Sequence, residues 1–159
     1  KTAYEIYQCD WSSDVCSSDL VGDVEIFCIW PKRDPNVNSN TPNNASVSLL
    51  VKTKELTLLL PGDIEPIAQD AILKLAGNIN VAVVKVPHHG SRYQSVDFAR
   101  ATKAKVAVIS VGRENKYGHP SMDTIWLYQS IGAKVIRTDE HGSIAIWAKA
   151  NRVKVKSEK

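Results

Sequence analysis

The sequence has no apolar run near the roughly 18–20 residues of a membrane span, so we expect no transmembrane segment and a chain soluble by itself. It has only three cysteines in 159 residues, and their spacing excludes a disulfide framework and a zinc knuckle. The apolar fraction of 43% and the mixed charge exclude a disordered tail, a collagen and a coiled coil. The length fits one globular domain.

Residues 1–20 differ in origin from the rest of the chain. Residues 1–6 (KTAYEI) and 11–20 (WSSDVCSSDL) match, in one reading frame, the translation of the two constant parts of an indexed sequencing adapter. We interpret residues 1–20 as an adapter-derived artefact and expect that deleting them leaves the stability unchanged. The alternative is a natural amino-terminal segment rich in Ser and Asp. On the adapter interpretation, residues 21–159 are a partial domain that lacks its upstream part.

Residues 21–159 have a basic excess. Residues 1–20 hold one lysine and four acidic residues, so the remainder holds 19 basic and 13 acidic residues, a net charge of +6. This excess suits a polyanionic partner without naming one. Cys28 is then the one remaining cysteine, and its apolar surroundings predict a small buried side chain.

The hydrophobic pattern alternates strands with helices and shows no internal domain boundary. Helices are expected at 66–76, 96–102 and 122–131, with Ser95 and Ser121 as N-caps and Gly77 as the C-cap of the first. Strands are expected at 24–30, 46–52, 56–60, 81–86, 106–111, 135–138 and 143–147, with a possible edge strand in 152–159. The pattern predicts an α/β fold of the α+β type.

Polar loops with glycine follow four successive apolar strands, and they contain all four histidines. Asp63 follows the strand 56–60, and the later loops contain His88 and His89, then His119, then His141. In α/β folds, ligands bind in the crevice outside the carboxyl ends of strands. We therefore expect Asp63, one of the paired histidines and His119 to converge on one face.

Two adjacent imidazoles before Gly90 suggest a metal site. Each loop alone is also compatible with an ordinary turn, and Asp63 alone with the N-cap of the helix that follows. A carboxylate at one strand end and imidazoles at the next are suitable ligands for zinc or manganese. We interpret Asp63, His88 and His89 as ligands of one or two divalent ions.

The ordered motifs resemble one family. PGD after LTLLL is followed by VVKVPHHGS, VISVGRENKYGHP and TDEHGSI, between about residues 44 and 146. This set resembles the carboxy-terminal metallo-β-lactamase-fold domain of the ComEC competence proteins, bacterial membrane proteins for DNA uptake. The resemblance implies an αββα sandwich with a di-metal site between its sheets. It also implies a hydrolase that degrades the DNA strand that is not imported.

The resemblance also implies roles for individual residues. Asp63 matches an acidic ligand that usually bridges two metals, and His89 matches the last metal histidine of the fold. His88 is either the metal ligand itself or a hydrogen-bond donor to a ligand. His119 matches a loop for phosphate contact or proton transfer. The expected catalytic residues are therefore Asp63, His89 and His119. The expected substrate contacts are Ser91, Arg113, Asn115, Lys116, Tyr117 and His119.

Some of these roles have alternatives. Arg113 and Lys116 fit solvated loop charges as well as phosphate contacts. His141 fits a turn as well as a functional position.

Two departures from the family pattern bear on activity. The His-x-His-x-Asp-His motif that supplies most ligands of the first metal is absent from the chain, and we expect it upstream of residue 21 in the parent protein. Asn43, Asn44 and Ser46 lie where many members of the fold have a histidine. We therefore expect the chain alone to be inactive.

The activity expected of the intact domain is metal-assisted hydrolysis of DNA phosphodiesters. The parent would be a bacterial membrane protein with this domain on its outer face, partnered by its own membrane channel portion. Two alternatives remain: a stand-alone metallo-β-lactamase-fold hydrolase of small esters or thioesters, and an inert DNA-binding module on the same scaffold.

Overall fold

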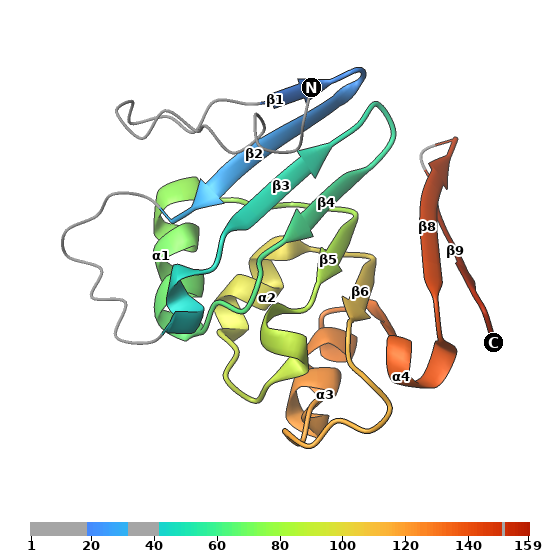
Figure 1. Cartoon of the computed structure of the whole chain (residues 1–159). Helices are drawn as coiled ribbons and strands as arrows, with labels where there is room; N and C mark the ends of the chain where they lie inside the picture. Colours follow the sequence, from blue (N-terminus) through green and yellow to red (C-terminus); the bar gives the residue numbers. More distant parts are fainter. Residues whose placement is uncertain (1–18, 32–41, 151) are drawn as a thin grey trace, which may run out of the picture.

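A seven-stranded sheet and a separate two-stranded ribbon organise the fold (Figure 1). The computed structural model describes residues 19–31, 42–150 and 152–159. The large sheet contains β1 (Asp19–Val21), β2 (Val24–Trp30), β3 (Ser48–Lys52), β4 (Thr57–Leu60), β5 (Val83–Lys85), β6 (Val106–Ile109) and β7 (Lys134–Arg137), and the ribbon contains β8 (Ile144–Lys149) and β9 (Arg152–Ser157).

The helices connect the strands of the large sheet. The longer ones are α1 (Pro66–Ala76), α2 (Val96–Thr102) and α3 (Met122–Ser130), and the shorter ones are η2 (Pro42–Ala45), η3 (Pro87–Gly90) and α4 (Thr138–His141). The strands follow one another in sequence order, antiparallel from β1 to β4 and parallel from β4 to β7. Each parallel step therefore passes through one of the three longer helices.

Strand alternation gives the sheet two apolar faces. Leu59 and Val84 pack with the buried residues of α1, α2 and α3, whereas Val83 and Val106 pack toward Ile146 and the other inward residues of the ribbon. The chain therefore has three layers: helices, large sheet and ribbon. The prediction of a mixed α/β fold is confirmed.

Most predicted elements occur with small changes of boundary. The strand 24–30 and the helices 66–76 and 96–102 have the predicted bounds, and the Ser95 hydroxyl accepts a hydrogen bond from the Phe98 N–H as the predicted N-cap. The strand predicted at 106–111 ends at Ile109, because the Val111 N–H donates to the Thr138 hydroxyl instead of to a strand.

Three predictions need correction. Ser121 precedes α3 but makes no side-chain cap hydrogen bond, and the predicted turn before Gly142 is the one-turn helix α4. Cys28 is partly buried rather than fully buried, and its thiol donates to the Trp30 carbonyl oxygen.

The predicted limit at residue 21 is not a limit in the structure. Asp19 and Leu20 belong to β1 and pair with Ile26 and Glu25 of β2. Residues 1–18 lie outside the described part of the chain, so the adapter interpretation stays a prediction. Among the described residues, no helix is both long enough and apolar enough to cross a bilayer.

Candidate metal and substrate site

The loops after β4, β5 and β6 bring the predicted residues together. His89 Nε2 lies 3.5 Å from Asp63 Oδ1, and the rings of His88 and His119 meet edge to face with centroids 5.3 Å apart. These loops meet because β4, β5 and β6 are parallel neighbours with their carboxyl ends at one edge of the sheet. Asp63, His88, His89 and His119 thus form one cluster, as the sequence predicts.

In the neutral ring of His89, the nitrogen without a proton faces Asp63. His89 Nδ1 lies 2.7 Å from the backbone carbonyl oxygen of Ser110, which can only accept a hydrogen bond. Nδ1 therefore carries the proton, and in the neutral ring Nε2 presents its lone pair to the carboxylate. This backbone contact is the arrangement that orients metal-binding histidines.

His88 and His89 have an unusual backbone conformation. Their φ values are +46° and +51°, in the left-handed region that costs a residue with a side chain about 1–2 kcal/mol. The His88 N–H donates to the Gly62 carbonyl oxygen, and its Nδ1 lies 3.5 Å from Glu65 Oε1, outside a hydrogen bond. The structure therefore holds both imidazoles in place against a local backbone preference.

His119 has a depressed basicity. Partial burial lowers its pKa, the neighbouring His88 and His89 lower it further, and Asp63 opposes them. His119 is therefore mainly neutral near pH 7 and can accept a proton. The exposed ring of Tyr117 stacks near it, with centroids 6.4 Å apart.

Lys85 is a site residue that sequence reasoning missed. Its ammonium group lies 3.3 Å from Asp63 Oδ1 and donates to the Gly62 carbonyl oxygen at 3.0 Å. Lys85 thus neutralises the same carboxylate oxygen that faces His89. The sequence signal that could have identified Lys85 is its position within the apolar strand VVKV, three residues before His88.

A polar brace behind the Asp63 loop was missed as well. Asn44 is buried, and its side-chain oxygen accepts a hydrogen bond from the Glu65 N–H at 2.9 Å, while its carbonyl oxygen accepts from the Trp30 indole at 2.7 Å. The Ser46 hydroxyl accepts from the Asp63 N–H at 3.2 Å. Asn44 and Ser46 therefore support the loop that presents Asp63.

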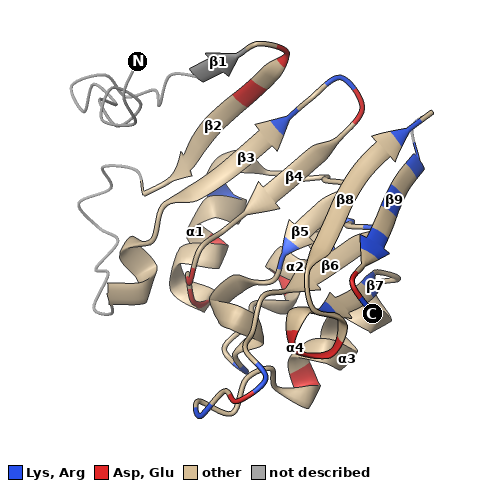
Figure 2. Cartoon of the chain, turned by 45° about the vertical axis from the view of Figure 1, so that its right-hand side comes forward, with Lys and Arg blue, Asp and Glu red and all other residues tan. Residues whose placement is uncertain are grey.

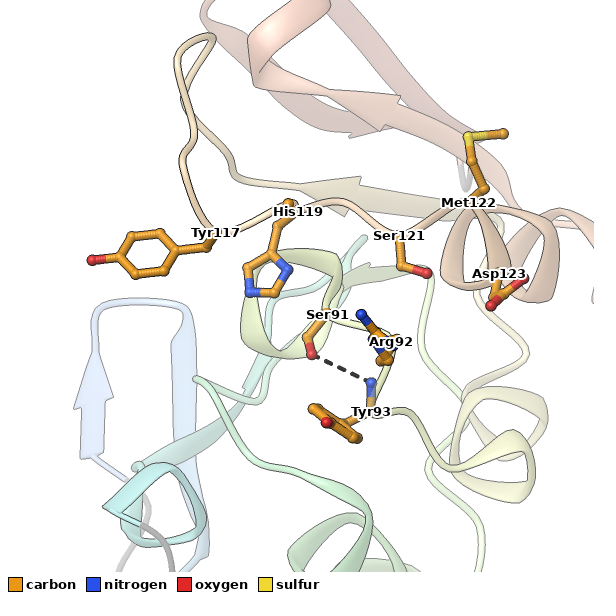
Figure 3. A pocket seen from close by; sticks show the side chains of 9 residues that line it. Ser91, Arg92, Tyr93, Tyr117, His119, Ser121, Met122 and Asp123 are labelled. Atoms are coloured by element: carbon orange, nitrogen blue, oxygen red, sulfur yellow. Dashed lines mark hydrogen bonds between the residues drawn. The ribbon is translucent and has the colours of Figure 1, made fainter.

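Two pockets flank the loop between Tyr117 and His119. One, of 460 Å³, lies between the 91–93 segment and residues 117–123, and Figure 3 shows His119 pointing toward Ser91. The other, of 670 Å³, is lined by His89 and by residues between 111 and 119, including Asn115 and Lys116. Substrate therefore has room on both sides of His119.

The remaining predicted residues lie in different settings. Ser91 is only 1% exposed, and its hydroxyl accepts a hydrogen bond from the Tyr93 N–H, so it shapes the pocket wall (Figure 3). The Asn115 side chain accepts from the Tyr117 N–H at 2.7 Å. Arg113 lines neither of these pockets. His141 Nδ1 contacts the Arg137 carbonyl oxygen, and no contact in the described ranges joins it to the cluster.

The donor set suits a metal ion but is incomplete. Two ligands at about 2.1 Å from one tetrahedral zinc ion lie about 3.4 Å apart, close to the 3.5 Å between His89 Nε2 and Asp63 Oδ1. Within the described residues, no group of three or more His, Cys, Asp or Glu side chains is placed to hold a metal ion. Asp63 and His89 therefore form a two-donor arrangement.

Comparison with known proteins gives three relatives, and no family model matches the chain. It is 36% identical over 103 residues to ComE operon protein 3 of Bacillus subtilis, which covers 64% of this chain and 13% of that protein. It is 30% identical over 123 residues to competence protein ComA of Neisseria gonorrhoeae (76% and 17%) and 30% identical over 119 residues to the uncharacterized protein YcaI of Escherichia coli (74% and 15%).

The chain thus spans less than a fifth of the length of each of these relatives. On these similarities, the chain is related to competence proteins.

Proposed function

We propose that this chain is the carboxy-terminal part of a metal-dependent phosphodiesterase domain in a bacterial DNA-uptake protein. The observation that carries the proposal is the pair Asp63 Oδ1 and His89 Nε2, which face each other at 3.5 Å while His89 Nδ1 is anchored on a carbonyl oxygen. The three layers would be the helix, sheet and partial second sheet of an αββα metallo-β-lactamase-like sandwich.

The residues of the cluster have complementary roles in this proposal. Asp63 and His89 would hold zinc or manganese, with His88 as a third candidate ligand. When bound, such an ion acts as a Lewis acid and generates a nucleophile from water near neutral pH. Neutral His119 would contact the phosphate or move a proton, and Lys116 would favour an anionic substrate near the 670 Å³ pocket.

The incomplete donor set fits a domain that continues beyond this sequence. A catalytic zinc site takes about three protein ligands, and the related competence proteins are several times longer than this chain. In such a parent the domain would lie on the outer face of the cell membrane, next to the membrane channel portion, with DNA as its substrate. The parent would then supply the remaining ligands.

Metal binding by the chain itself tests the site assignment. We expect measurable but weak zinc affinity in competition with a chromogenic chelator, and a drop of about tenfold or more in Asp63→Asn and His89→Ala. His141→Ala is the matched control, because His141, at the end of α4, does not join the cluster. Equal zinc affinity of all four proteins would contradict the assignment.

Hydrolysis is tested in a longer protein that includes the upstream sequence of the same gene. We expect manganese- or zinc-dependent cleavage of DNA that is lost in Asp63→Asn and retained in His141→Ala. Cleavage of thioesters but not DNA would favour the small-substrate hydrolase. Metal-independent DNA binding without cleavage would favour an inert DNA-binding module, which the two-donor arrangement also fits.

A further inference from the structure

The ribbon of β8 and β9 places its charged side chains on one face and its branched apolar side chains on the other. Along both strands, partly buried and exposed residues alternate. The inward set, which includes Ile144, Ile146, Val153 and Val155, packs on the large sheet. The outward set consists of Ala145, Trp147, Lys149, Arg152, Lys154 and Lys156. We refer to these six residues as the outward ribbon face.

The outward ribbon face combines four cations with one large aromatic side chain. Lys154 lies directly across from Trp147, and Arg152 lies across from Lys149. Trp147 is 44% exposed although it is among the largest apolar side chains of the chain. Figure 2 shows the cations along β9, and neither ribbon strand contains an acidic residue. Within the described residues, none of the four cations forms a salt bridge.

The arrangement of these charges fits a nucleic-acid strand. Side chains two residues apart on a β-strand lie about 6.6–6.8 Å apart, so Arg152, Lys154 and Lys156 form a row with that repeat. Proteins that bind single strands combine such a line of positive charge, which follows the backbone, with aromatic side chains on which the bases stack. An exposed indole beside such a row can stack on a base, which requires an unpaired strand.

From the row of cations and the exposed indole, we infer that the outward ribbon face binds single-stranded nucleic acid, and DNA in particular. The inference rests on the proposed function for the choice of DNA. The phosphates contact Arg152, Lys154 and Lys156, and Trp147 stacks on a base. The ribbon is thus a binding surface separate from the Asp63–His89 pair.

A hydrogen bond joins the end of β9 to the residue before β8. Glu158, just after β9, accepts a hydrogen bond from the Ser143 N–H, and this bond together with the nearby charges of Lys159 and Arg113 lowers the pKa of its carboxyl. Arg113 belongs to the loop between β6 and His119.

Protection of a sheet edge does not explain the whole pattern. Lysines on edge strands prevent unwanted strand pairing, and this accounts for cations on β9. Since β8 and β9 are both edge strands, it accounts for Lys149 as well, but it does not account for an exposed Trp147 among these cations. Edge protection and strand binding also differ in their consequences for DNA affinity, which makes them separable.

The test is fluorescence anisotropy of a labelled 20-nucleotide single strand with the full chain in EDTA, so that hydrolysis plays no part. We expect Lys154→Gln with Lys156→Gln to weaken binding about tenfold at low salt and to reduce the slope of log affinity against log salt by about 1.4. Lys74→Gln with Lys103→Gln is the matched control, because it removes two exposed lysines from the helix side. The control should keep the wild-type slope.

The aromatic part of the inference has its own variants. Trp147→Ala should weaken single-strand binding about tenfold, and Trp147→Tyr should restore most of it, which a purely structural role would not require. Equal losses from the ribbon pair and the control pair would overturn the inference. Loss of binding to anionic phospholipid vesicles with unchanged DNA affinity would overturn it in favour of a membrane surface. Neither result depends on whether the protein cleaves DNA.

Discussion

The loop cluster and the ribbon place their polar groups by different means. In the cluster, Asp63, His89 and His119 come from three loops. Left-handed backbone at His89 and hydrogen bonds from the backbone of Asp63 and the ring of His89 hold these loops in position. On the ribbon, cations lie outward because successive residues of a strand face opposite sides. The cluster depends on the tertiary fold, whereas the outward ribbon face depends on local alternation.

This difference predicts different responses to substitution. A change in the loop cluster should lower the stability, because it disturbs close packing and buried polar groups together. A change on the outward ribbon face should alter binding with little loss of stability, because exposed side chains away from special features contribute within about 0.5 kcal/mol. The predictions below test this contrast from the largest expected effect to the smallest.

The largest effect is expected for Gly90→Ala, in the loop of the paired histidines. Gly90 has φ +80°, and an added Cβ would lie 2.7 Å from Pro120 Cβ, next to His119. Both the left-handed backbone and this overlap should act against alanine, so we expect a loss of about 3 kcal/mol in the free energy of unfolding. Urea denaturation measures the loss.

Gly132→Ala is the matched control for this prediction. Gly132 has a similar φ of +87°, but a Cβ there would meet nothing within 4 Å. It should show the backbone contribution alone, about 1–2 kcal/mol. Equal losses in the two variants would mean that Gly90 is not tightly packed against Pro120. Single-strand binding through the ribbon should survive in folded Gly90→Ala protein.

The second effect concerns the brace behind Asp63. Asn44→Ala removes the acceptor for the Glu65 N–H at a position that is 1% exposed, so we expect a loss of about 2 kcal/mol. Asn78→Ala, at an exposed position after α1, should change the stability by less than about 0.5 kcal/mol. Thermal and urea unfolding of both variants measure the difference. A neutral Asn44→Ala would show that the brace is dispensable.

The same contrast explains which features were predictable. The helix 66–76 and the strand 24–30 were predicted with their bounds, because local periodicity and the flanking Gly77 and Pro31 define them. The convergence of Asp63, His89 and His119 was predictable because each follows a strand, and parallel strands share a carboxyl edge. Their roles as ligands and catalysts remain predictions.

Other features had no local signal. Asn44 and Ser46 accept hydrogen bonds from backbone N–H groups 21 and 17 residues further along the chain. No local sequence pattern predicts such contacts. Lys85 contacts Asp63 from a strand whose sequence is otherwise apolar. A single cation in such a strand does not indicate which side chain it will contact. The separation of β8 and β9 from the large sheet also depends on the packing of whole layers.

A third, smaller effect is expected in α4, which connects the large sheet to the ribbon. Arg137 donates to Asp139 in α4, between β7 and β8, and this hydrogen bond lowers the pKa of the Asp139 carboxyl below its ordinary 3.8. A lowered folded-state pKa means that the stabilisation is present above pH 4 and is lost as the pH falls through the folded value. Asp139→Asn should therefore cost about 1 kcal/mol at pH 7 and progressively less below pH 4.

Asp97→Asn is the control for the pH dependence. Asp97 pairs with Arg100 at 3.9 Å, but its side chain is 80% exposed, so solvent screens the pair. Its variant should match the wild-type protein from pH 7 to pH 3 in urea unfolding. A constant difference between Asp139→Asn and wild type over that range would contradict the linkage.

The smallest effect is expected in the core on the helix side of the large sheet, at Tyr128 of α3. Its side chain is fully buried, and its hydroxyl has no hydrogen-bond partner among the described residues. Removing an unsatisfied buried hydroxyl without changing the ring should be neutral or stabilising, so we expect Tyr128→Phe to gain up to about 1 kcal/mol. The urea midpoint should rise at an unchanged slope, while Tyr93→Phe, with its ring exposed, should leave the midpoint unchanged.

A loss above about 1 kcal/mol in Tyr128→Phe would mean that the hydroxyl is satisfied, for instance by a buried water. Since Tyr128 belongs to neither the loop cluster nor the ribbon, zinc affinity and single-strand affinity should both stay at their wild-type values.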